Sequence, residues 1–118
     1  MESILTSIKK MIGVDVTYTF FDPEIIMHIN TALSVLTQLG VGPSEGFSIQ
    51  DDNAIWSDFI GDNPNLDLIK TFMGLKVKLF FDPPQASAHI EAINRQCDEL
   101  EFRILVTVNP REEEIQNG

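Results

Sequence analysis

The sequence is poor in residues that could form covalent or metal cross-links. Its only cysteine, Cys97, cannot form a disulfide within the chain, and no second thiol or His/Cys cluster is available for zinc. Cys97 falls in a helical series of apolar residues, which favours a buried small side chain over a reactive thiol. With 43% hydrophobic residues, the chain is expected to fold around an apolar core without a cofactor.

Long hydrophobic runs are also missing. Lys, Asp or Gly interrupts each apolar stretch before it reaches the roughly 18 to 20 residues of a transmembrane helix, so we expect no membrane span. In the N-terminal segment MESILTSIKKMIGV the lysines lie inside an amphipathic stretch rather than ahead of an apolar block. This arrangement argues against a secretory signal, and we expect the protein to stay in a cytoplasm.

Basic residues are scarce. The chain has 8 Lys and Arg against 18 Asp and Glu, which gives a formal net charge of -10. A net negative charge repels the phosphate backbone, so a nucleic-acid-binding protein is disfavoured. An acidic surface does suit a passage through which DNA must slide without sticking.

Familiar catalytic motifs are absent from the sequence. His28 and His89 have no Ser, Cys or carboxylate at a catalytic or metal-binding spacing, so both are expected to be structural or surface residues. The acidic runs at 50–52, 97–101 and 111–114 are expected to be solvated charge, since a metal or glycosidase site needs carboxylates that converge in a cleft. The segment GVGPSEG lacks the lysine of a phosphate-binding loop. We therefore expect no catalytic residue, no metal site, no cofactor and no enzyme activity.

The apolar residues that are present predict one all-α domain. They recur at helical spacing over residues 3–12, about 23–39, 53–61 and 66–81, and from a start between 84 and 87 to Ile104. At 118 residues the chain can build one core but not two. The expected fold is a small bundle of four to five helices with a long internal loop and an extended C-terminal arm.

Local signals predict where these helices begin and end. Gly13 and Gly40 suit left-handed C-terminal caps. Asp22 followed by Pro23 predicts a helix start, with Asp22 as the cap. Asn53, or a neighbouring Asp, and Asn65 are the expected caps of the two helices that follow.

The sequence Asp82-Pro83-Pro84 predicts a hard stop after the fourth helix, because Pro83 cannot continue it and biases Asp82 away from helical angles. The stop is expected to set the angle between that helix and the last one. The last helix is expected to pack through residues spaced by three and four: Ile90, Ile93, Cys97, Leu100 and Ile104.

The connection at residues 41–52 is longer than most in a compact domain, and such loops are often functional. Its segment GFSI could pair briefly as an extended strand. Phe20 and Phe21 are expected to pack against the core from the preceding loop. We divide the chain into a helical domain at residues 1–105 and an extended arm at 106–118, which would be ordered only when something holds it.

The order of these segments resembles a known family. INTALSVLTQLGVG, WSDFIG and the lysine-dotted helix that ends in LFFDPP, taken together over residues 4–103, are similar to head-to-tail connector proteins of tailed phages, especially those of Gram-positive bacteria. The resemblance implies a helical adaptor that forms a ring, usually a dodecamer, beneath the portal. It would extend the DNA channel and dock a stopper or tail component at the virion neck, after assembly in the host bacterial cytoplasm.

The resemblance also implies how such an adaptor would contact its partners. By position, the arm at 106–118 would grip the portal, and the loop at 41–52 would reach the next layer or a neighbouring subunit. We therefore take six residues as candidate partner contacts, with core packing as the alternative for the aromatic ones: Phe47, Ile49, Trp56, Val108, Pro110 and Arg111. A different acidic interaction module, regulatory or toxin-neutralising, is the alternative function.

Overall fold

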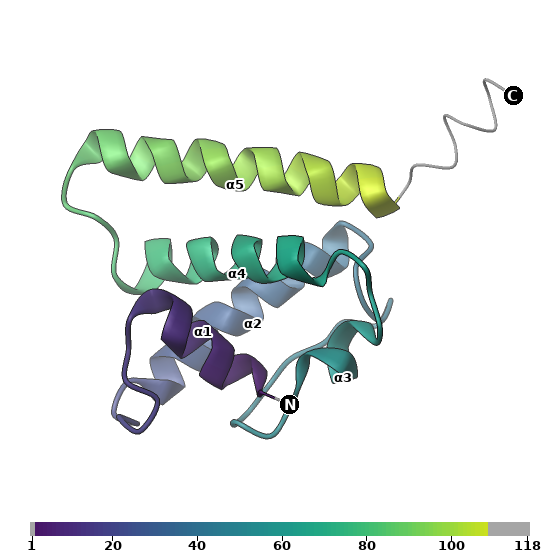
Figure 1. The fold of residues 1–118 in the computed structure, drawn as a ribbon, viewed down its shortest axis with the longest axis horizontal. Coiled ribbons are helices and arrows are strands. Elements are labelled where there is room, and N and C mark those ends of the chain that lie inside the picture. The colour runs from purple at the N-terminus through teal and green to yellow at the C-terminus, as the bar shows by residue number, and fades with distance from the viewer. Residues whose placement is uncertain (1, 109–118) are drawn as a thin grey trace, which may run out of the picture.

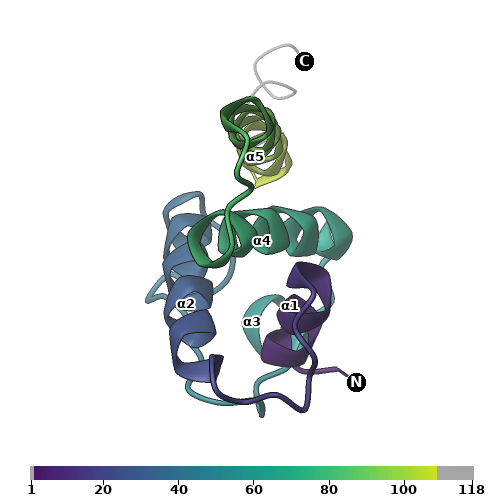
Figure 2. The same ribbon diagram turned by 90° about the vertical axis from the view of Figure 1, so that its left-hand side faces the viewer.

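The computed structural model describes residues 2–108, which form five helices and no strand. The helices are α1 (Ile4–Ile12), α2 (Asp22–Gln38), α3 (Trp56–Ile60), α4 (Leu66–Phe81) and α5 (Ser87–Val108). Helices α1, α2 and α4 pack on one another and α3 closes the remaining side, whereas α5 lies along the outer side of α4 (Figures 1 and 2). The predicted all-α bundle is confirmed. None of the helices within residues 2–108 is long and apolar enough to cross a bilayer.

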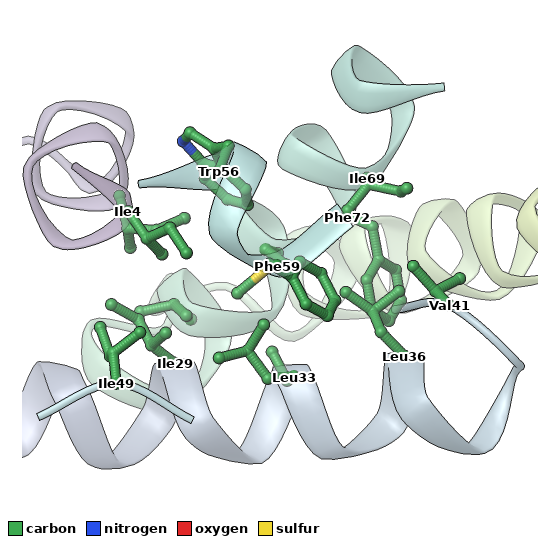
Figure 3. Close-up of a cluster of buried hydrophobic side chains, with 14 of the residues drawn as sticks. Ile4, Ile29, Leu33, Leu36, Val41, Ile49, Trp56, Phe59, Ile69 and Phe72 are labelled. Carbon is green, nitrogen blue, oxygen red and sulfur yellow. The ribbon is translucent and has the colours of Figure 1, made fainter. Parts of the chain in front are cut away.

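The core forms where the apolar faces of the first four helices meet. Ile4 comes from α1, Leu33 from α2, Phe59 from α3 and Phe72 from α4, and all four side chains are buried (Figure 3). Helix α4 is central, because it contacts α1, α2 and α5. The bundle therefore depends on α4 as the element that joins α5 to the rest of the molecule.

Several helix ends follow the predicted local signals. Ser3, for which no cap was predicted, also caps α1, since its Oγ accepts a hydrogen bond from Thr6 N at 3.0 Å. Gly13 and Gly40 adopt φ angles of 81° and 92°, the left-handed conformation expected after α1 and α2. Pro23 lies in the first turn of α2, as predicted.

Two cap predictions were wrong, and a third was right in position only. Asp22 is the first residue of α2, and its carboxylate binds the Lys9 ammonium instead of capping the helix. Helix α3 begins at Trp56 rather than after Asn53, and Asp58 Oδ2 accepts a hydrogen bond from Ile55 N at 2.9 Å. Asn65 does precede α4, but its side chain makes no capping hydrogen bond.

The Asp-Pro-Pro stop acts as predicted. Helix α4 ends at Phe81, Asp82 has φ -146° and ψ 69°, and α5 begins at Ser87. Helix α5 packs on α4 through four buried residues of the expected series: Ile93, Cys97, Leu100 and Ile104. The fifth residue of that series, Ile90, is half-buried. The helix then continues to Val108, so the first three residues of the expected arm are helical. The rest of that arm lies outside the described residues.

Candidate interaction site

The long α2–α3 loop is fastened to the bundle at its middle. The Asn30 side-chain amide donates to Ile49 O at 3.0 Å, and its Oδ1 accepts from Ile49 N at 2.8 Å. These two bonds replace the strand pairing expected for GFSI, and the one isolated bridge within residues 2–108 joins Ser3 to Ile55 instead. The loop therefore lies against α2, and Ile49 is only 3% exposed.

Both aromatic candidates, Trp56 and Phe47, also face inward. Trp56 lies among the buried core side chains (Figure 3). It is 3% exposed, and its Nε1 donates to Ser7 Oγ at 3.0 Å. Phe47 is half-buried, with its ring centroid 5.2 Å from that of Phe59. In the folded chain these side chains pack in or against the core, which is the alternative that the sequence left open.

Of the three C-terminal candidates, only Val108 lies within the described residues. Val108 is 37% exposed and lies beside the backbone of Gly40, where an added Cβ would be 3.0 Å from a Val108 methyl carbon. Pro110 and Arg111 lie outside the described residues. Of the six candidates, the structure brings Phe47 and Trp56 to α3, Ile49 to α2 and Val108 to the end of α2.

Several exposed aromatic residues at the ends of α2 and α4 form a cluster that the sequence did not lead us to expect. The rings of Phe20 and Phe21 are 5.1 Å apart, Tyr18 lies 5.8 Å from Phe21, and Phe81 of α4 lies 5.4 Å from Phe21. Phe20 is 74% exposed, Tyr18 50% and Phe21 37%, so the expectation that Phe20 and Phe21 pack against the core was wrong. We call Tyr18, Phe20, Phe21 and Phe81 the aromatic patch.

A repeated tetrapeptide could have revealed this patch. The sequence FFDP occurs twice, at residues 20–23 across the start of α2 and at residues 80–83 across the end of α4. Each copy has its aspartate 2.8 Å from a lysine, Lys9 for Asp22 and Lys78 for Asp82. The two copies meet through the Phe21 and Phe81 rings, so the helix-ending signal and the aromatic surface are parts of one arrangement.

A buried lysine holds the aromatic patch in place. The Lys9 side chain is 2% exposed, and its Nζ donates to Val16 O at 3.1 Å, to Tyr18 O at 2.7 Å and to Asp22 Oδ1 at 2.8 Å. All three donor sites of the ammonium are therefore used on the α1–α2 connection. An ammonium removed from water needs such partners, so this connection is fixed rather than free to collapse onto the core.

A second exposed apolar surface lies on the outer side of α5. Phe102 is 66% exposed, Leu105 42% and Val106 45%. Their spacing of three and four places them along one stretch of the helix, away from the Cys97–Ile104 side that packs on α4. We call these three residues the α5 stripe.

Charge is distributed unevenly along the chain. No Lys or Arg occurs between residues 11 and 69, whereas nine acidic residues do: Asp15, Asp22, Glu24, Glu45, Asp51, Asp52, Asp58, Asp62 and Asp67. This acidic segment includes α2, the long loop and α3. Lysines and arginines of the described structure lie on α1, α4 and α5, so negative charge dominates the α2–α3 part of the molecule.

The two histidines and the cysteine of the described residues lie apart from one another in the sequence and have different surroundings. His28 lies 3.7 Å from Glu24 and beside the Phe80 ring, and His89 is exposed. Burial raises the pKa of the Cys97 thiol, which makes it less reactive. No group of three or more His, Cys, Asp or Glu within residues 2–108 is placed to hold a metal ion.

Comparison with known proteins gives one match. No curated protein and no solved structure matches the chain. A family model described as phage connector protein matches residues 4–111, which include all five helices. Because this match spans far more than half of the sequence, the chain belongs to the phage connector protein family.

Proposed function

We propose that this connector protein is a head-to-tail adaptor of the type found in phages and prophages of Gram-positive bacteria. It assembles as a ring, a dodecamer, beneath the portal, extends the DNA channel and docks the stopper or a tail-completion protein. It acts at the virion neck after assembly in the host cytoplasm. The observation that carries the proposal is the family match over residues 4–111, the whole of the helical bundle.

The surface of the subunit supports a structural role. The chain has a buried apolar core and, in addition, two exposed apolar surfaces, the aromatic patch and the α5 stripe. Exposed apolar patches of this kind mark sites of protein contact. A ring subunit needs two different contact faces, and this chain offers them on different elements.

The charge of the chain supports a passive role toward DNA. With a net charge of -10 and nine acidic residues in the segment without Lys or Arg, the α2–α3 part would repel a phosphate backbone. A channel wall with this sign lets DNA pass without specific binding. We therefore assign the acidic α2–α3 part to the lumen side of the ring.

The loop and the arm are proposed as contacts with the other layers. Asn30 holds the loop at Ile49, so we assign the contact to its exposed tip at residues 42–46, with Phe47 at its base. The arm at 106–118, including Pro110 and Arg111, is assigned to the portal. Its first turn, up to Val108, belongs to α5 and would present the remaining residues from the end of that helix.

A gene deletion tests the proposal. Particles made without this chain should lose packaged DNA or remain without tails, because the path between the portal and the tail is interrupted. Electron microscopy of the particles and a nuclease-protection assay of their DNA give the two readouts. Heads that keep their DNA and join tails without the chain would refute the proposal.

The genes on either side provide a further discriminator. Portal, capsid and tail genes favour the adaptor. A separate operon with a nuclease or toxin gene would favour the alternative, an acidic regulatory or toxin-neutralising module.

A further inference from the structure

The two exposed apolar surfaces lie too far apart to cover each other within one subunit. The α1–α2 connection and the C-terminal end of α4 lie at one end of the long axis, and the C-terminal end of α5 lies at the other end (Figure 1). The aromatic patch belongs to the first end and the α5 stripe to the second. A second copy of the chain, placed end to end, brings one surface against the other.

The exposed area is sufficient for such a contact. Taking about 200 Å² for a fully exposed aromatic side chain, the aromatic patch and the α5 stripe together expose about 600 Å² of apolar surface. Because interfaces are roughly 60% apolar, burying both surfaces corresponds to a contact of about 1,000 Å² in total. This lies at the lower limit of specific interfaces, so the pairwise contact is weak and closing a ring would strengthen it.

The contact also has the geometry that a ring requires. A surface that pairs with itself closes at a dimer, whereas two different surfaces that pair with each other leave one of each free at the ends. The subunit can then add further copies until the ring closes. The Lys9 contacts hold the α1–α2 connection in one conformation, so the aromatic side of the interface is formed before association.

We propose that the aromatic patch of one subunit binds the α5 stripe of the next, with Phe20 and Phe102 as the two principal contacts. The inference rests on the proposed function, because it names the two faces through which the ring subunits meet. The occupant of each surface is a second copy of this chain.

Complementary variants test the pairing. Phe20→Asp damages the aromatic patch and leaves the α5 stripe intact, whereas Phe102→Asp does the reverse. Sedimentation velocity on the full chain, up to millimolar concentration, measures association of the wild type, of each variant alone and of an equimolar mixture. The wild type should associate progressively with concentration, and each variant alone should bind itself at least tenfold more weakly.

The mixture gives the decisive result. One intact surface remains on each variant, so the mixture should form a species of twice the 13.3 kDa chain mass and nothing larger. Asn94→Asp adds the same charge to an exposed position of α5 outside the stripe, and it should associate like the wild type. Both phenylalanines are mostly exposed, so the unfolding midpoints should stay close to the wild-type value. Tyr18→Asp and Val106→Asp provide a second pair if either variant misfolds.

Several results would overturn the pairing. These are a wild type that stays monomeric, a variant that still self-associates like the wild type, or a mixture without a heterodimer. A neck ring that incorporates both variants normally would also overturn the pairing while leaving the proposed function intact. A heterodimer from the mixture, without a ring on the portal, would support the pairing and refute the proposed function.

Discussion

The buried contact between Lys9 and Asp22 allows a quantitative test of how the α1–α2 connection is held. Asp22→Asn removes the counter-charge and leaves an ammonium that is 2% exposed with only neutral oxygens as its partners. Removing one member of a buried ion pair costs about 3 to 5 kcal/mol. We expect about 3 kcal/mol, the low end, because the Asp22 side chain is 21% exposed and water reaches it.

Lys9→Met provides the comparison that isolates the charge. Methionine fills a similar volume and leaves no buried cation. The remaining loss is the donor to Val16 O and Tyr18 O, while the Asp22 carboxylate, 21% exposed, turns to water instead; together we expect about 2 kcal/mol. Asp22→Asn should therefore destabilise the protein more than Lys9→Met does. The double variant should be no less stable than Asp22→Asn alone, because without the lysine the missing carboxylate no longer matters.

Urea unfolding followed by far-UV circular dichroism measures these differences. For a chain of 118 residues, 3 kcal/mol corresponds to a fall in the melting temperature of about 12 °C. The slope of the free energy against urea should stay unchanged, so that the midpoint alone reports stability. A loss below about 1 kcal/mol for Asp22→Asn, or a larger loss for Lys9→Met, would refute the reasoning that Lys9 is a desolvated ion.

Three further predictions concern other parts of the subunit. Asn30→Ala removes both bonds to Ile49, so limited proteolysis should cut the loop at residues 41–52 at least several-fold faster; an unchanged rate would contradict its role as the anchor. The Cys97 thiol, buried and with a raised pKa, should react with a disulfide reagent at pH 8 only as fast as the protein unfolds; rapid reaction in native buffer would contradict its burial. Truncation after Val108 should leave the circular dichroism spectrum and melting temperature nearly unchanged but weaken portal attachment in a pull-down; loss of the fold or full attachment would contradict the role of the arm.

The helix boundaries were predictable because their causes are local. Gly13 and Gly40 permit a left-handed turn, and Pro83 forbids another helical turn, whatever surrounds them. The caps were less predictable, because a side chain such as Asp22 can choose between its own helix and a distant partner. Its partner Lys9 lies in α1 and reaches it only after α1 and α2 have packed together.

The contact surfaces depend on long-range packing and were harder to predict. Phe20 is as hydrophobic as Phe72, and only the geometry of the bundle places the first outside and the second in the core. Trp56 was singled out as a partner contact, but Ser7, 49 residues earlier, provides its hydrogen-bond partner inside the fold. The repeated FFDP was visible in the sequence, but its meaning required the contact between Phe21 and Phe81.

The central claim, a ring adaptor at the neck, is tested most directly by a cryo-electron microscopy reconstruction of the neck of a complete particle. The account predicts a ring of copies of this five-helix bundle between the portal and the tail. In that ring, the α5 stripe of each copy should lie against the aromatic patch of the next, and the acidic α2–α3 part should face the lumen. A neck that lacks this chain, or contains it without contacts between its copies, would contradict the account.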